Sequence, residues 1–159
     1  MKGLPGDAYT VTLDDDQLVH QIIERSTKVR TVGIRSSEEL LSRLEELHPI
    51  AVFVDIDFAS SKSGLDIIPS IRQAWPFCPI MAVTDTPTEI TIVRALNSGA
   101  DDFIRKPLIP DEVNARFKLR INDAVQKAAK EVVVFGDITI DSAHRTVEGP
   151  LCKRFASPI

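Results

Sequence analysis

The sequence predicts an α/β protein with a five-stranded parallel sheet, followed by a short antiparallel β segment. Two observations lead to this prediction. From residue 9 to residue 130, short β-branched or apolar runs alternate with segments whose apolar residues recur at helical spacing, and this alternation happens five times. After residue 131 the pattern changes to short β-branched runs separated by Gly, Asp and Ser. Because parallel crossovers are right-handed, five such units form a doubly wound sheet with helices on both faces.

Each unit carries its own signals. The continuously apolar run over residues 50–54 suits a strand that is buried on both faces. Ser36 with Glu39 three residues later forms a capping-box pattern that opens a helix. Strands are expected over 9–13, 29–34, 50–54, 79–83 and 102–104. Helices are expected over 17–25, from Ser36 to Leu47, and over 65–75, 86–99 and 110–130.

The fourth expected helix has the clearest end signals. Thr86 is the expected N-cap, Pro87 the first helical residue and Gly99 the residue past the end. In the third helix, Pro69 is tolerable only near the first turn, because proline lacks the backbone N–H that a helix interior requires.

Composition excludes several classes of protein. A 43% hydrophobic content is that of a globular chain with a core, and a net charge of −4 argues against a chain-wide nucleic-acid surface. Cys78 and Cys152 lie far apart without a CxxC pattern, so we expect reduced thiols in a cytosolic protein. The first ten residues lack the apolar core of a signal peptide, and no run of about 18 apolar residues predicts a membrane span.

Polar residues follow four of the predicted strands. In doubly wound folds the ligand site lies beyond the carboxyl ends of the strands, so these residues are expected to converge. Crowded carboxylates repel one another and attract a cation, and a few oxygen ligands of this kind suit Mg²⁺. The residues are Asp14, Asp15 and Asp16, then Asp55 and Asp57, then Thr84 and Asp85, and finally Lys106 with Pro107.

Together these groups predict a Mg²⁺-assisted phosphoryl site. An aspartate is available as nucleophile, Lys106 can neutralise a phosphoryl group, and the Thr84 hydroxyl can donate to a phosphoryl oxygen. Each group alone has an ordinary alternative: the acidic triplet as a solvated turn or helix cap, the threonine as a cap, and Lys-Pro as a common dipeptide. Their occurrence together at the ends of four predicted strands favours the phosphoryl site.

Four segments resemble the receiver domain of bacterial two-component response regulators. They are LDDD (13–16), PIAVFVD (49–55), IMAVT (80–84) and SGADDFIRKP (98–107). The resemblance covers roughly residues 8–126, and the 22 residues from Thr84 to Lys106 (106 − 84) match the family's usual interval. It implies a flavodoxin-like sheet with strand order 2-1-3-4-5.

The resemblance also implies a role for each matching residue. Asp55 is the phosphoacceptor, Thr84 the switch hydroxyl, Phe103 the switch aromatic and Lys106 the phosphate-binding lysine, whose peptide bond to Pro107 is usually cis. The alternative for Phe103 is a plain core aromatic. The implied cofactor is Mg²⁺, with Asp14, Asp15, Asp55 and the backbone carbonyl of Asp57 around it.

This chain departs from the family pattern in the loop after Asp55. Ala59 replaces the usual proline, and Gly64 comes nine residues after Asp55 (64 − 55) where eight is usual. Asp85 stands where the family has a small residue, so we expect slowed self-phosphorylation or altered dephosphorylation. The side chain of Asp57 is expected to tune how long the phosphoryl group survives.

The tail resembles the opening β-strands of the OmpR/PhoB-type winged-helix effector domain. The matching segment is FGDITIDSAHRTVEG (135–149). We therefore expect a receiver over 8–126, a linker over 127–131 and a truncated effector domain over 132–159. Such a chain would reach DNA only through the missing part, which includes the recognition helix. A stand-alone receiver with a non-functional tail is the alternative.

The implied partners are a sensor histidine kinase and, after phosphorylation, a second copy of the chain. The expected dimer face comprises the helix over 86–99, the strand over 102–104 and the helix over 110–130, with charges at Asp101, Asp102, Glu112, Arg116 and Arg120. A solvated charged face is the alternative. Two other functions stay open: a phosphorelay or protein-interaction module, and a Mg²⁺-dependent phosphohydrolase with an aspartate nucleophile. The function that we expect ahead of these two is a non-enzymatic response regulator that controls transcription.

Overall fold

The computed structural model describes residues 6–57 and 62–130, together with the backbone of four strands between residues 132 and 156. The chain divides into two compact units, Met1–Ile121 and Asn122–Ile159, and the boundary falls within a helix. Within the part of the chain that is described, no helix is long and apolar enough to cross a membrane.

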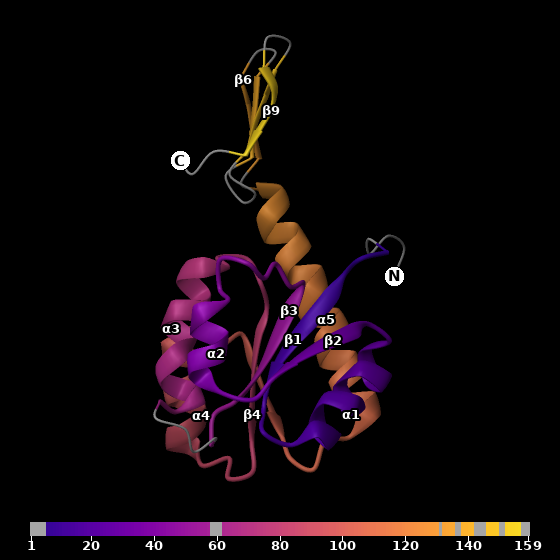
Figure 1. Cartoon of the computed structure of the whole chain (residues 1–159), viewed down its shortest axis with the longest axis vertical. Coiled ribbons are helices and arrows are strands. Elements are labelled where there is room, and N and C mark those ends of the chain that lie inside the picture. The colour runs from indigo at the N-terminus through magenta and orange to yellow at the C-terminus, as the bar shows by residue number, and fades with distance from the viewer. Residues whose placement is uncertain are drawn as a thin grey trace. The chain divides into compact units, whose positions relative to one another are not determined.

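The first unit is built on a parallel sheet with strand order β2-β1-β3-β4-β5 (Figure 1). Every pairing between neighbouring strands is parallel, so all five carboxyl ends lie at the same edge. The predicted fold is confirmed. The strands are β1 (Tyr9–Leu13), β2 (Arg30–Ile34), β3 (Ala51–Asp55), β4 (Ile80–Thr84) and β5 (Asp102–Arg105).

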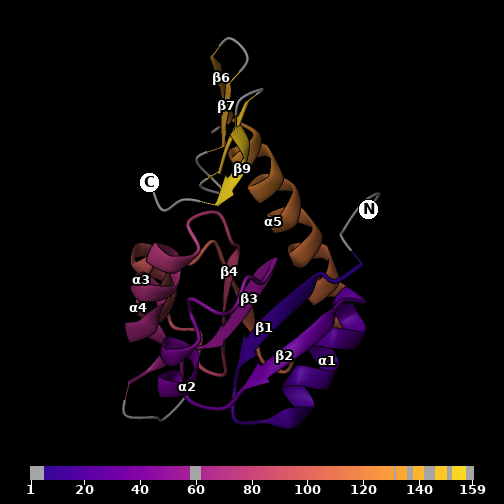
Figure 2. The same cartoon turned by 45° about the horizontal axis from the view of Figure 1, so that its top comes forward.

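Helices cover both faces of this sheet, as the two views show (Figures 1 and 2). The helices are α1 (Gln17–Thr27), α2 (Ser37–Ser42), α3 (Gly64–Ala74), α4 (Glu89–Ser98) and α5 (Pro110–Lys130). One apolar core packs α1 and α5 around the fully buried Phe53, and the other packs α2, α3 and α4 around Val52 and Val54. Alternate residues of β3 thus contribute to opposite cores, which is why its first four residues are all apolar.

Helix starts differ from the expectation in two places. The helix α4 begins at Glu89 with Thr88 as its N-cap, so the predicted cap at Thr86 is wrong. The Thr86 hydroxyl instead lies 3.4 Å from Oδ1 of Asp57, a partner far away in the sequence. In α3, Pro69 lies inside the helix, beyond its first turn, because the helix already starts at Gly64.

The strand β2 lies at one edge of the sheet, next to α1. The backbone N–H of Thr31 donates to Oε2 of Glu24 at 2.8 Å, so a side chain of α1 takes up a donor of the edge strand. A buried or half-buried N–H needs such a partner, because an unpaired one costs free energy.

The second unit contains the end of α5 and a four-stranded sheet in the order β6-β7-β8-β9. Its strands are β6 (Val132–Phe135), β7 (Ile138–Asp141), β8 (Thr146–Gly149) and β9 (Cys152–Ala156), and they pair antiparallel. Residues 127–130 of the expected linker continue α5, and residue 131 lies outside the described residues.

Candidate functional site

Two buried carboxylates and one ammonium group meet at the carboxyl ends of β1, β3 and β5. Lys106 Nζ lies 2.8 Å from Asp14 Oδ2 and 2.9 Å from Asp55 Oδ2. The carboxylates are almost inaccessible, with 1% of the Asp14 side chain and 7% of the Asp55 side chain exposed. The parallel topology brings these three side chains together although they are distant in sequence, as the strand-end pattern suggested. The Lys106–Pro107 peptide bond is cis, as expected.

Burial and pairing act against each other in this cluster. Burial raises the pKa of Asp55, while its hydrogen bond and ion pair with Lys106 oppose that rise. Burial also opposes the charged form of Lys106, but its contacts with Asp14 and Asp55 outweigh burial and raise the pKa of the ammonium group. Lys106 therefore stays charged at neutral pH, ready to meet an anionic group.

The acidic triplet divides into three environments. Asp14 is buried and its Oδ1 accepts from the backbone N–H of Asp16 at 2.8 Å. Asp15 is exposed, and its carbonyl oxygen accepts from Arg35 Nη2 at 3.3 Å. Asp16 is the N-cap of α1, where its side chain accepts from the N–H of Leu18. The helix-cap alternative thus holds for Asp16 alone.

The carboxylate oxygens at this edge of the sheet fit a Mg²⁺ ion that is held by few protein ligands. Oδ2 of Asp14 is buried and contacts the Lys106 ammonium group at 2.8 Å, so a carboxylate oxygen that can accept a further partner faces the cluster. Mg²⁺ needs only one or two carboxylates when waters and phosphoryl oxygens complete its shell. Among the described residues, no three His, Cys, Asp or Glu side chains are grouped as a ready-made metal cage. The expected ligands Asp14, Asp15, Asp55 and Asp57 do lie at the same end of the sheet, beyond β1 and β3.

The side chain of Asp57 is engaged with the loop that follows β4. Its Oδ2 accepts from the Thr84 hydroxyl at 2.7 Å and from the backbone N–H of Asp85 at 2.7 Å. Partial burial raises the pKa of Asp57, but the hydrogen bonds from Thr84, Asp85 and Thr86 outweigh it and lower that pKa. Meanwhile the backbone N–H of Asp57 donates to Asp55 Oδ1 at 2.9 Å. Asp57 thus links the expected phosphoacceptor to the expected switch threonine.

Gly64 allows the backbone at the start of α3 to lie close to the end of β3. A Cβ atom at this position would overlap the carbonyl group of Asp55, which is backbone and cannot move aside. The longer loop after Asp55 therefore still ends in a glycine that packs directly beneath the acidic site. Ala59 lies outside the described residues.

Most of the charges on the expected dimer face are paired within the chain. Asp102 accepts from Arg116 at 2.9 Å and from Arg120 at 3.1 Å, and Glu112 accepts from Arg116 at 2.9 Å. The guanidinium of Arg116 also lies over the ring of Phe103, 5.8 Å from its centre. Phe103 is half-buried against the core between the sheet and α3.

Asp101 lies in a different network, one that the sequence did not reveal. Its Oδ2 pairs with Arg72 at 2.6 Å and accepts from the N–H of Ile80 at 2.8 Å. The same guanidinium donates to the carbonyl oxygens of Pro76, Cys78 and Gly99. Asp101 therefore serves to hold α3 against β4 and the end of α4.

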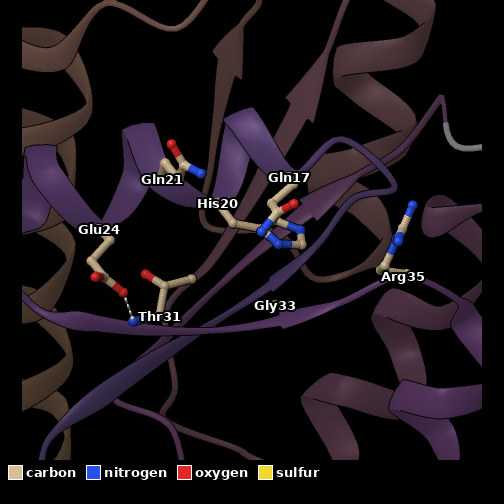
Figure 3. Close-up of a pocket in the computed structure, with 7 residues that line it drawn as sticks. All are labelled: Gln17, His20, Gln21, Glu24, Thr31, Gly33 and Arg35. Carbon is tan, nitrogen blue, oxygen red and sulfur yellow. Dashed lines mark hydrogen bonds between the residues drawn. The ribbon is translucent and has the colours of Figure 1, made fainter.

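A polar groove lies between α1 and β2, close to the acidic site (Figure 3). It has a cavity volume of about 400 Å³, with Arg35 toward one end and Glu24 toward the other. His20 Nε2 lies 2.9 Å from the carbonyl oxygen of Asp14, and its ring lies so close to Gly33 that a Cβ there would overlap it. A glycine inside the β-branched run RTVGI is the sequence signal that could have indicated this close approach.

A comparison with protein families matches residues 11–118 to the response regulator receiver domain. The chain belongs to this family. Receiver domains are usually signalling modules rather than enzymes.

Relatives of the receiver include DNA-binding regulators. The chain is 30% identical over 141 residues to the DNA-binding response regulator MtrA of Mycolicibacterium smegmatis, and the match covers 85% of this chain and 60% of that protein. It is 30% identical over 112 residues to the transcriptional regulatory protein TrcR of Mycobacterium tuberculosis, covering 69% of this chain and 43% of that protein. The chain thus spans about half the length of these relatives.

Solved structures show the same fold. A CheY-like receiver domain from Methanospirillum hungatei matches with a TM-score of 0.69 at 19% identity, over 76% of this chain and 98% of that one. DrrB of Thermotoga maritima, an OmpR/PhoB homologue, matches with a TM-score of 0.63 at 22% identity, over 89% of this chain and 63% of that one. A Burkholderia pseudomallei regulator, whose structure holds a phosphorylated aspartic acid, calcium and citrate, matches with a TM-score of 0.64 at 20% identity, over 81% and 78%.

Proposed function

We propose that the receiver accepts a phosphoryl group on Asp55 from the phosphohistidine of a sensor histidine kinase in the cytoplasm. The observation that carries this proposal is the convergence of Asp55, Asp14 and Lys106, with Lys106 Nζ 2.9 Å from Asp55 Oδ2. A carboxylate oxygen of Asp55 would attack phosphorus, the phosphorus–nitrogen bond would break, and its electron pair would stay on the imidazole of the kinase.

The neighbouring side chains supply charge and hydrogen bonds to the transferred group. Lys106 Nζ already contacts Asp55 Oδ2, the kind of oxygen to which the phosphoryl group would be attached. After transfer, Lys106 would exchange this contact for one with a phosphoryl oxygen. The Thr84 hydroxyl would donate to a second phosphoryl oxygen. A bound Mg²⁺ ion, held by Asp15, Asp55 and the carbonyl of Asp57 with Asp14 beside it, would neutralise charge on the transferring group.

The proposed output is control of a DNA-binding effector domain. Residues 8–126 would be the receiver, 127–131 the linker and 132–159 the first strands of a winged-helix domain. The match to MtrA, which extends over 141 residues, and the antiparallel strands after α5 support this division. A shift of Thr84 toward the phosphoryl group would open space that Phe103 can fill, and this would repack the face formed by α4, β5 and α5.

Two chains are then proposed to associate through that face. Its charges would be those of Asp102, Glu112, Arg116 and Arg120, which lie together on β5 and α5. Asp101 lies apart from this group, because its carboxylate pairs with Arg72 of α3.

The proposal is tested by incubating the protein with acetyl phosphate and Mg²⁺ and measuring the mass of its peptides. The peptide containing Asp55 should gain one phosphoryl group, and Asp55→Asn should gain none there. Asp66→Asn is a matched control, because the Asp66 side chain bonds to Ser63 in the capping box of α3 and has no bond to Asp55 or Lys106, so its replacement should leave labelling unchanged. Equal labelling of Asp55→Asn and the parent would contradict the proposal.

A further inference from the structure

The carboxylate of Asp57 gathers several donors of the loop after β4. The Thr84 hydroxyl and the Asp85 N–H both donate to Oδ2 at 2.7 Å, and the Thr86 hydroxyl lies 3.4 Å from Oδ1. The N–H of Thr86 in turn donates to the Thr84 hydroxyl oxygen at 3.1 Å. The single hydroxyl proton of Thr84 is therefore committed to Asp57.

Burial does not force this arrangement on Asp57. Asp57 lies after the end of β3 and is exposed, so its carboxylate could be hydrated instead. Thr84 is fully buried at the end of β4, so its hydroxyl group requires a hydrogen-bond acceptor within the protein. Charge-assisted hydrogen bonds to a carboxylate are short and about twice as strong as neutral ones. The 2.7 Å distances fit that class.

We infer that Asp57 is a positioning residue whose carboxylate occupies the Thr84 hydroxyl in the unphosphorylated protein and competes for it with the phosphoryl group. This inference rests on the proposed function, because it concerns the hydroxyl that is proposed to bind a phosphoryl oxygen. A hydroxyl has one proton to donate, so Thr84 must leave Asp57 before it can donate to the phosphoryl group.

The competition lowers the affinity of the site for phosphoryl groups. The new hydrogen bond replaces an existing one of similar strength, so Thr84 adds less binding free energy than a free hydroxyl would. Replacing Asp57 by alanine removes the competitor and should tighten the binding of a phosphoryl mimic by about tenfold, the equivalent of one charge-assisted hydrogen bond. Asp57→Asn keeps a neutral acceptor and should have a smaller effect of the same sign.

The test measures beryllofluoride binding at saturating Mg²⁺ by ¹⁹F NMR in the full chain. The variants form a cycle: parent, Asp57→Ala, Thr84→Ala and the double variant. If Asp57 acts through Thr84, Asp57→Ala tightens binding in the parent but changes it by less than about twofold in the Thr84→Ala background. In a Thr84→Ser background, which keeps the hydroxyl, the tightening should return.

The cycle separates competition from simple charge repulsion. Repulsion between Asp57 and the anion would persist without the Thr84 hydroxyl, so an equal effect in both backgrounds overturns the inference. Asp85→Asn is the matched control, because Asp85 takes part through its backbone N–H and its neutralisation leaves the Asp57 contacts intact. Its effect should be the same in both Thr84 backgrounds.

A second readout needs neither metal nor phosphoryl mimic. In the metal-free protein, the amide proton of Asp85 should move upfield in Asp57→Ala, because it loses a carboxylate acceptor. An unchanged shift overturns the inference. If the parent itself does not bind beryllofluoride, the proposed function fails together with the inference; if the parent binds and the cycle is additive, the inference alone fails.

Discussion

Replacing Lys106 by methionine tests how much the ammonium group contributes to the folded state. The change leaves two carboxylates facing one another, Asp14 with 1% and Asp55 with 7% of the side chain exposed. Breaking a buried ion pair by removing one partner costs about 3–5 kcal/mol. Because 15% of the Lys106 side chain is exposed and water can reach the cluster, we expect about 3 kcal/mol, the lower end of that range.

The loss should depend on pH and on Mg²⁺. Without Lys106, the pKa of Asp55 rises further above its unfolded value. A raised carboxyl pKa costs stability above the unfolded pKa, and this cost grows with pH until the pH passes the folded pKa. The deficit should therefore be larger at pH 7 than at pH 5, where protonation of the folded carboxyl relieves part of it. Millimolar Mg²⁺ should recover part of the stability at pH 7, because a cation returns to the carboxylates.

Urea denaturation followed by tryptophan fluorescence measures this loss. Trp75 is the single tryptophan and lies in the first unit, so it reports on the receiver. At about 1.5 kcal/mol per molar, a loss of 3 kcal/mol moves the midpoint by about 2 M. Arg105→Met, at an exposed position beside Lys106, should change stability by less than about 0.5 kcal/mol. A Lys106→Met deficit that is absent, or equal at pH 5 and pH 7, would refute the reasoning.

Three further predictions concern groups around the site. Gly64→Ala should cost about 3 kcal/mol in urea denaturation, because its Cβ overlaps the Asp55 carbonyl; a loss below about 1 kcal/mol would contradict that contact. Gly33→Ala should cost only about 1–2 kcal/mol, since the His20 ring can swing away, and NMR should show that ring displaced rather than unmoved. Burial raises the pKa of Cys78 to about 12, so in a variant whose other cysteine is serine, iodoacetamide at pH 8 should label Cys78 only after unfolding.

Local signals explain how much of the fold was predictable. The apolar run over 50–54 predicted a buried strand, and β3 spans Ala51–Asp55. The parallel topology then implied that Asp14, Asp55 and Lys106 would meet, because residues after parallel strands share one edge. Neither step required knowledge of contacts between distant side chains.

The parts that failed depend on such distant contacts. Thr86 and Thr88 are both local candidates for the cap of α4, and the choice follows from Asp57, 29 residues before Thr86. The sequence suggested that Asp101 is a surface charge, but in the structure its carboxylate pairs with Arg72, which is also 29 residues away. No periodicity or spacing in the sequence encodes these pairings, because they arise from how α3, β4 and the loops pack.

The hydrogen bond from the Thr31 N–H to Glu24 bears on how the protein avoids assembling with itself. An edge strand with open donors is a template on which another chain can add a strand, and such growth leads to aggregates. Here the side chain of an adjacent helix fills one of those donor positions on β2, and the His20 ring lies against Gly33 two residues further on. The solubility of the folded chain at this edge therefore depends on α1 staying docked. Loosening α1 would expose a template for fibre growth and would also disturb Asp14, whose carbonyl oxygen contacts His20 of that helix.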